Sequence, residues 1–406
     1  MIYALSYLAF PLFGWSLAKR IEDRAARIGF AFLAGALLLT IEATLFTIVG
    51  IRWSVWALAI PLIAASLLPV EDRRPRLSGQ AWRLSSTGIV AIAIAHFFFS
   101  NLTAQSVSPD FVLFWGPKAA RFALSHSLDP HFLLSRYPPP RVDYPPLVPI
   151  VEAWGALVAK DFPWITAASM SAIWLLAAVP VIRWLTQSWE ATAFWTAAMC
   201  ASQVFSGGGG NAEAMLIAYL SVGAAAIVAN RTTIAAIAFA GATLTKEEAF
   251  ITIAAILIGV AIRNIKQALI LGAASVMSAC VWFAYQWRFG LPIGYSRFNT
   301  QHHFFWSNLP TIFSEAPKSL AAGCWGLAWL IPLAILVTRS REQLKDVMPL
   351  LVPIPLLFGF FVFLYLQYES ALAMRMWWIL PRISQPPMSL LILAAAFASS
   401  DRMRAP

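Results

Sequence analysis

The chain has 406 residues, of which 60% are hydrophobic and 12% charged, and it carries a formal net charge of +10 at pH 7. So apolar a composition excludes a soluble enzyme, because a water-covered surface needs more polar residues. The apolar residues form unbroken segments and do not alternate with polar ones, which predicts helices as the membrane spans. The three cysteines stand far apart, and their spacing favours core residues over a metal site.

The apolar segments predict about thirteen transmembrane helices. The first of them lacks a basic residue before it and has Lys19 and Arg20 after it, so we expect a retained anchor with its N-terminus outside. The expected spans lie near 2–18, 28–50, 53–69, 87–104, 164–182, 191–205, 212–229, 233–245, 249–262, 267–287, 321–338, 347–366 and 377–399.

The distribution of charge tests this topology. With the N-terminus outside, the expected cytoplasmic segments hold 17 of the 29 lysines and arginines and carry a net charge of +9, whereas the rest of the chain carries +1. This asymmetry follows the positive-inside rule and predicts a multi-pass protein of a bacterial inner (plasma) membrane. The basic excess therefore reports orientation and contact with membrane lipids, and nucleic acid is excluded as a partner.

The same topology predicts the domain organisation. Residues 1–86 form accessory transmembrane helices, residues 87–399 form the main membrane domain, and residues 400–406 are a cytoplasmic tail. Residues 105–163 form one large external loop. Its apolar segment 147–159 is too short for a span and would invert every later loop if it were one, so we expect an interfacial helix there.

Polar residues gather first in the external loop. Asp110 follows the fourth expected span in the sequence SPDFVLFW, where a carboxylate can be held by cations and still reach a substrate, as a general base requires. A helix-capping aspartate is the structural alternative, because the sequence around it resembles a helix start. Lys118, Asp143 and Tyr144 of the same loop are candidates for substrate contact.

Two more clusters lie on the expected outer side in the middle of the chain. The segment GGGGNAEAM, 207–215, combines glycines that permit close backbone approach with Glu213, which is a candidate substrate contact or a helix cap. The segment LTKEEAF, 244–250, places Lys246 and Glu247 between two apolar segments. Lys246 suits a lipid phosphate and Glu247 a substrate contact, and the alternative is a locally neutralised turn.

The last cluster is basic. Arg375 and Arg382 lie in AMRMWWILPRISQPP, where a guanidinium within an apolar run needs an anionic partner. That partner is either a substrate phosphate or a salt-bridged carboxylate such as Glu369 or Glu42. His303 in the loop 288–320 is a further candidate for substrate contact. Together with His302 it could bind a metal ion, but adjacent histidines more often form a solvated pair.

These motifs, in this order and on one expected side of the membrane, resemble the bacterial GT-C glycosyltransferases. The closest likeness is to the protein-mannosyltransferase-like and aminoarabinose-transferase-like branch, over residues 87–399. The resemblance implies a GT-C-like all-α fold, a polyprenyl-phosphate-linked sugar donor, and an acceptor hydroxyl on a glycan, lipid or protein at the outer, periplasmic face. It also implies that Asp110 is the base and that Lys246 and Arg382 contact the donor phosphate, with Arg375 as a further phosphate contact.

The implied reaction is a single displacement with inversion, in which Asp110 removes the acceptor proton and the basic residues stabilise the departing phosphate. Asp110 lacks the adjacent acidic residue of many relatives, so we assign no metal ligand, although a divalent cation is left open as a cofactor. Two rivals also stay open. A transporter or flippase for a lipid-linked substrate predicts inverted repeats and broken helices. An outer-face acyltransferase or polysaccharide ligase predicts a histidine base, at His131, His302 or His303.

Overall fold

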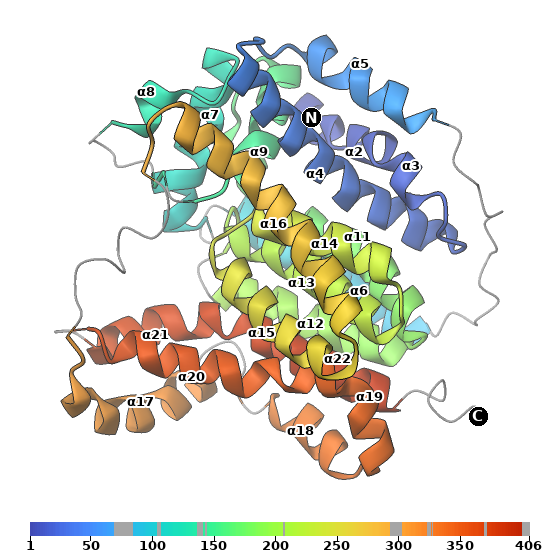
Figure 1. Ribbon diagram of the computed structural model, residues 1–406, viewed down its shortest axis with the longest axis vertical. Coiled ribbons are helices and arrows are strands. Elements are labelled where there is room, and N and C mark those ends of the chain that lie inside the picture. Colours follow the sequence, from blue (N-terminus) through green and yellow to red (C-terminus); the bar gives the residue numbers. More distant parts are fainter. Residues whose placement is uncertain are drawn as a thin grey trace.

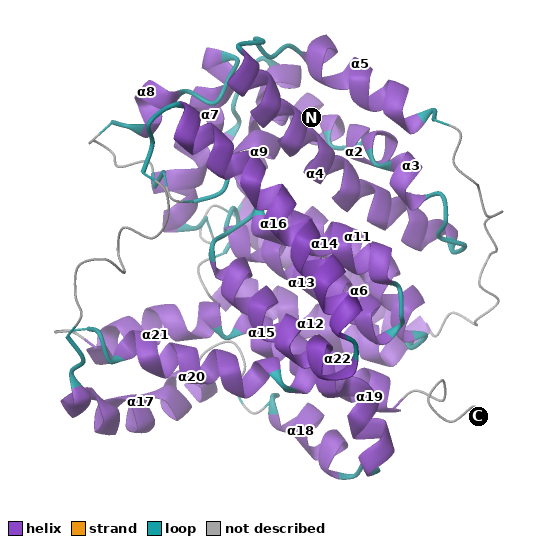
Figure 2. Ribbon diagram, in the orientation of Figure 1, coloured by secondary structure: helices purple, strands orange, loops and turns teal. Residues whose placement is uncertain are grey.

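The computed structural model describes most of the chain, and its described part is helical throughout (Figure 2). Helices make up 81% of the described residues, and no strand is formed among them. The described residues are 1–68, 84–103, 107–135, 141–142, 144–205, 208–292, 303–322, 326, 328–368 and 372–399. The all-α class expected from the apolar segments is therefore confirmed.

The N-terminal helices pack around one long helix, α4, which lies beside the short helices at the blue end of the chain (Figure 1). The expected first span, 2–18, is divided into three short helices. Gly14, at one of the breaks, lies against α4, and a Cβ there would meet the main-chain oxygen of Ala31 at 2.1 Å. The helices are α1 (Ile2–Ser6), α2 (Ala9–Phe13), α3 (Trp15–Ala18), α4 (Arg24–Val49) and α5 (Val55–Ser66).

The external-loop segment forms its own helices. The helix α9 has the bounds expected for an interfacial helix, but all residues from Leu147 to Ala156 are buried, because it packs against α1, α4 and α7. It therefore belongs to the core of the protein and does not lie on its surface. The elements here are the π-helix η1 (Phe111–Trp115), α7 (Gly116–Ser125), α8 (Pro130–Leu133), α9 (Leu147–Ala159) and α10 (Trp164–Ser169).

The central bundle surrounds α13, whose residues from Ala212 to Ile227 are all buried. It packs against α11, α14 and α22, so a polar side chain on α13 is held inside the protein. The helices of the bundle are α6 (Leu84–Leu102), α11 (Ser171–Thr186), α12 (Trp189–Phe205), α13 (Ala212–Val228), α14 (Thr232–Thr243), α15 (Glu248–Arg263) and α16 (Ile265–Arg288).

The C-terminal helices form a layer beneath this bundle in the view of Figure 1. Helices α21 and α22 meet at a bend of 42° at Ser384, and α22 then runs into the core against α12 and α13. The elements are the 3₁₀-helix η2 (Trp306–Asn308), α17 (Leu309–Ala322), α18 (Leu330–Val337), α19 (Arg341–Leu351), α20 (Pro353–Tyr365), α21 (Leu372–Ile383) and α22 (Gln385–Ser399).

Five helical stretches of the described residues are long and apolar enough to cross a membrane, and a sixth is added if the bent pair α21–α22 counts as one span. They are Arg24–Val49, Ser85–Leu102, Trp164–Thr186, Ile265–Arg288 and Arg341–Tyr365. The number of thirteen spans is thus not confirmed. Several expected spans are helices that are too short, such as α13 with 17 residues and α14 with 12. The five long apolar stretches nevertheless indicate a membrane-embedded protein.

Candidate functional site

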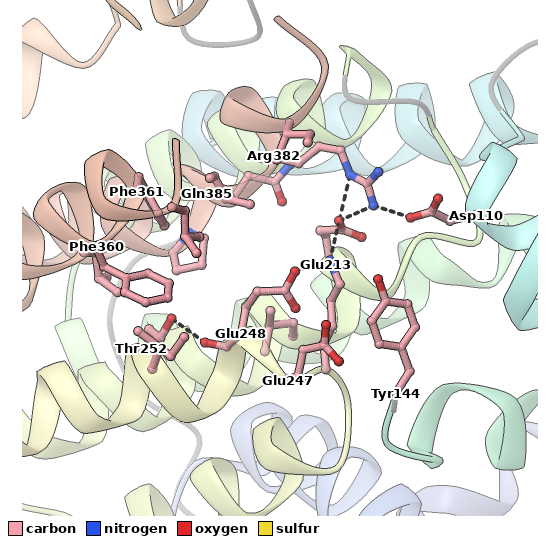
Figure 3. A pocket seen from close by; sticks show the side chains of 18 of the residues that line it. Asp110, Tyr144, Glu213, Glu247, Glu248, Thr252, Phe360, Phe361, Arg382 and Gln385 are labelled. Atoms are coloured by element: carbon pink, nitrogen blue, oxygen red, sulfur yellow. Dashed lines mark hydrogen bonds and ion pairs between the residues drawn. The ribbon is translucent and has the colours of Figure 1, made fainter. Parts of the chain in front are cut away.

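A cavity of about 620 Å³ lies between the central bundle and the C-terminal helices (Figure 3). Its wall includes as many acidic as basic residues, so the two signs of charge nearly balance. The ionisable residues are Asp110, Glu213, Glu247, Glu248, Arg141, Lys246, Arg375 and Arg382. The structure therefore brings together the acidic residue after the fourth expected span and the two mid-chain clusters with the basic residues near the C-terminus.

Five of these side chains form a continuous chain of ion pairs. The guanidinium Nη2 of Arg382 lies 2.5 Å from Asp110 Oδ2 and 2.5 Å from Glu213 Oε1. The ammonium of Lys246 lies 3.1 Å from the same Glu213 oxygen and 2.8 Å from Glu248 Oε1. Because each cation contacts two carboxylates, the four segments that carry these residues are held together at one end of the cavity.

Contacts of Ser108 hold the backbone next to Asp110 in place. The backbone N–H of Ser108 donates to the main-chain oxygen of Gly209 at 2.9 Å, and the Ser108 hydroxyl donates to the side chain of Asn211. These contacts join the start of the external loop to the start of α13. The Asp110 carboxylate makes no capping hydrogen bond to η1 and is turned toward Arg382, so the capping interpretation does not describe its side chain.

Lys246 lies in the tight turn between α14 and α15. The N–H of Leu147 donates to the main-chain oxygen of Leu244 at 2.8 Å, which fixes this turn against α9. Burial alone would lower the pKa of Lys246, but the carboxylates of Glu213 and Glu248 raise it above its ordinary value. The lysine therefore stays protonated. Its contact with Glu248 is the local pairing considered from the sequence, and its contact with Glu213 extends that pairing into the core.

Arg382 and Arg375 come from α21, one side of which lines the cavity. Arg382 pairs with Asp110 and Glu213 and not with Glu42, and Glu369 lies outside the described residues. Arg375 is exposed, and its guanidinium carbon lies 4.6 Å from the centre of the Tyr368 ring. The cavity thus has one arginine fixed between carboxylates and a second that rests on an aromatic face at the rim.

The other end of the cavity is apolar. It is lined by Leu357, Phe360, Phe361 and Leu364 of α20, together with Ile251 of α15. Figure 3 shows Phe360 and Phe361 on the side of the cavity away from Asp110. One end of the cavity therefore suits an anionic or hydroxyl-bearing group, and the other end suits hydrocarbon.

No protein-family model, curated protein or solved structure matches the chain.

The remaining expected site residues lie in different places. Tyr144 and Glu247 line the cavity. Lys118 does not line it, because it is buried beneath Tyr144, where its ammonium donates to the main-chain oxygen of Arg141 at 2.5 Å. His303 is exposed and does not line the cavity. The expected contact Asp143 lies outside the described residues.

Lys118 supports an aromatic stack at the cavity wall. The rings of Trp115 and Tyr144 stack with centroids 5.0 Å apart, and the Lys118 ammonium lies 5.3 Å from the Trp115 centroid. Arg141 lies 5.5 Å from the Tyr144 ring. This arrangement fixes the orientation of Tyr144.

Sequence reasoning missed several lining residues. Arg141 stands beside prolines in the run that also contains Asp143 and Tyr144, and its charge next to aromatic residues was the available signal. The aromatic residues of α20 gave no signal, because they are part of a continuous apolar segment. Within the described part of the chain, no three His, Cys, Asp or Glu side chains gather in a group that could hold a metal ion.

Proposed function

We propose that the chain is a membrane glycosyltransferase that transfers a sugar from a polyprenyl-phosphate-linked donor to an acceptor on the outer, periplasmic face of a bacterial inner membrane. The observation that carries the proposal is the cavity with a chain of ion pairs at one end and the apolar wall of α20 at the other. A lipid-linked sugar phosphate has the same division into a polar head and a hydrocarbon tail. The motif resemblance to the GT-C glycosyltransferases supports the same assignment.

In the proposed reaction, Asp110 removes the proton of the acceptor hydroxyl as its oxygen attacks the anomeric carbon. The bond between that carbon and the phosphate oxygen breaks, and the phosphate leaves on its lipid with the electron pair. Lys246 and Arg382 stabilise the charge that develops on the phosphate, with Arg375 as a further contact at the rim. The displacement is direct, so the anomeric configuration inverts.

The pairing between Arg382 and Asp110 gives the donor a second role. Arg382 contacts the carboxylate that we assign as base, at 2.5 Å. A donor phosphate drawn to Arg382 competes with that contact and leaves the Asp110 carboxylate available to the acceptor hydroxyl. Tyr144, Glu213 and Glu247 then remain to contact the sugar or to hold the cations in place, and Asp143 stays a proposed substrate contact. Lys118 and His303 do not line the cavity and are not assigned this role.

The proposal is tested by transfer from radiolabelled polyprenyl-phosphate sugars in membrane vesicles. We expect Asp110→Asn to lower the transfer rate by at least roughly 100-fold, because a positioned general base contributes that much or more. Lys246→Ala should mainly raise the KM for the donor. The control is Asp161→Asn, the same change at an exposed position that does not line the cavity. Turnover retained in Asp110→Asn would remove the proposed base.

A transporter or flippase for the same lipid-linked substrate is the second candidate. The bend of 42° between α21 and α22, next to Arg382, is the kind of broken helix that transporters place at a binding site. Movement of a labelled lipid across vesicles without any transfer, unchanged in Asp110→Asn, would favour it. The acyltransferase or ligase alternative is less supported, because no histidine of the described residues, His131 and His303 included, lines the cavity; His302 lies outside the described residues.

A further inference from the structure

A second cavity, separate from the proposed active site, lies between the ends of α4 and α16. Its volume is about 360 Å³, within the range of small-ligand sites. The last turn of α4 and the residues after it form one wall, and the end of α16 with part of the external loop forms the other. In Figure 1, the ends of α4 and α16 lie at the same end of the molecule.

The charge of this cavity is one-sided. Arg52 and Arg288 line it, and no acidic residue does. Neither arginine forms an ion pair with a described residue; the guanidinium of Arg288 lies over the ring of Phe289 at 5.5 Å. The nearby carboxylate of Asp129 is taken up by Arg121 at 2.6 Å and by the start of α8. Two uncompensated guanidinium groups facing one cavity favour an anion.

The position of the cavity indicates where that anion comes from. The helices α4 and α16 are both candidate membrane spans, and both end at the cavity, which places it at the level of lipid headgroups. Apolar side chains beside it are exposed, with Val49 at 66% and Trp287 at 77%. A tryptophan at such a position commonly marks the membrane interface, and exposed apolar side chains next to it provide a surface for acyl chains.

We propose that this cavity binds the headgroup of an anionic phospholipid, with the phosphate between Arg52 and Arg288 and the acyl chains along α4 and α16. A zwitterionic headgroup fits less well, because its ammonium would find no carboxylate in the cavity wall. The ligand chemistry shared by a lipid and by free phosphate is the phosphate group. The apolar flank is what selects the lipid.

The test uses the purified full chain in detergent, freed of lipid, and measures thermal unfolding and native mass spectra. Phosphatidylglycerol should raise the Tm by roughly 3 °C or more and remain bound in the mass spectrum, whereas phosphatidylcholine and inorganic phosphate should not. The variant Arg52→Gln with Arg288→Gln should lose both effects. The matched control is Arg24→Gln with Lys266→Gln, which removes two charges at the opposite ends of the same helices.

Three outcomes would overturn the proposal. Equal loss in the control variant would show a general attraction between basic residues and anionic lipid and no built site. An equal Tm shift with inorganic phosphate, lost in the Arg52/Arg288 variant, would assign the cavity to the free anion. Phosphatidylglycerol binding retained in that variant would place the lipid elsewhere. If the double variant does not fold, the two single variants are measured, and each should lose part of the shift.

Discussion

Glu213 connects the two cations assigned to the donor phosphate. Its Oε1 atom accepts from Arg382 Nε at 2.8 Å and from Lys246 Nζ at 3.1 Å, and the residue is 3% exposed. One buried carboxylate thus compensates two charges that would otherwise repel each other. Removing it leaves both cations less compensated in a region with little water.

We therefore expect Glu213→Gln to lower the free energy of unfolding by about 3 kcal/mol, the size observed when one partner of a buried ion pair is removed. Glu248→Gln is the matched control, because the side chain of Glu248 also pairs with Lys246 but is 33% exposed. Its effect should stay below about 1 kcal/mol. Chemical unfolding in detergent measures both changes, and equal values for the two variants would contradict the central position of Glu213.

A second buried carboxylate predicts a dependence on pH. The hydroxyl of Tyr3 donates to the side chain of Glu152 and to its main-chain oxygen, at 3.1 Å for the latter. Burial raises the pKa of Glu152 from 4.5 to about 8, although the hydrogen bond from Tyr3 lowers it. Because the folded state favours the protonated form, its contribution to stability is complete below pH 4.5 and is lost as the pH rises toward 8.

The Tm of the unmodified chain should therefore fall by a few degrees more between pH 5 and pH 8 than the Tm of Glu152→Gln, which mimics the protonated carboxyl at every pH. Differential scanning fluorimetry of the two proteins in the same detergent measures the difference. Parallel Tm curves would show that Glu152 titrates near its ordinary pKa in the folded protein.

At this scale, residue chemistry predicted much of the cavity wall. Asp110, Lys246 and Arg382 were chosen because a charge beside an apolar segment needs a partner, and the structure makes them neighbours. The pairing itself could not be predicted. Arg382 had two acidic candidates by sequence, Glu369 and Glu42, but its observed partners are Asp110 and Glu213, which no local pattern links to it.

At the scale of elements, glycines set the distance between the external loop and α13. Gly210 has a φ of +82°, and a Cβ there would meet the Phe111 ring at 2.4 Å. From the sequence, the glycines were expected to permit close approach to the backbone. In the structure, Gly209 and Gly210 let the chain pass directly against α6 and η1 and so bring Asp110 next to Glu213.

Gly210→Ala should therefore lower the free energy of unfolding by more than the strain of an alanine at this positive φ, because the new Cβ also meets Phe111. It should also lower the rate of sugar transfer by displacing η1. Gly290→Ala is the control, because Gly290 has a φ of +64° and open space around its Cα. The control should lower the free energy of unfolding by about 1 kcal/mol, and Gly210→Ala by roughly 2–3 kcal/mol. Equal losses in the two variants would show that the contact with Phe111 relaxes without consequence.

Helix breaks were the weakest part of the prediction from sequence. Apolar segments look continuous in 2–18 and 377–399, yet the chain divides at Gly14 and bends at Ser384. Hydrophobicity reports which residues avoid water, but it does not report where a neighbouring helix approaches closely. The break at Gly14 is a consequence of tertiary packing against α4, and the sequence alone contains no partner for it.

At the scale of the whole molecule, the cavity exists because four distant segments meet. Asp110 follows α6, Glu213 begins α13, Lys246 precedes α15, and Arg382 lies in α21. Composition predicted the all-helical membrane class, and the expected common side of the membrane predicted that the polar clusters would lie near one another. The number of spans was harder to predict, because short buried helices such as α14 are as apolar as helices that cross a bilayer.

The expected orientation makes a prediction of its own. Residues 105–163 were placed outside and residues 263–266 and 339–346 in the cytoplasm, from the distribution of lysine and arginine. Lys160, Lys266 and Lys345 are exposed positions in these three segments. In a chain whose native cysteines are replaced by serine, Lys160→Cys should react with an impermeant maleimide added to intact cells, whereas Lys266→Cys and Lys345→Cys should react only after the membrane is opened.

This experiment separates two topologies that the helices alone allow. If α9 crossed the membrane, every later segment would change sides, and Lys266→Cys and Lys345→Cys would react in intact cells. The burial of α9 against α1, α4 and α7 favours the expected orientation, because a helix of 13 residues covered by protein has neither the length nor the exposed surface of a span. Replacement of the exposed Cys280 ensures that only the introduced cysteines can react.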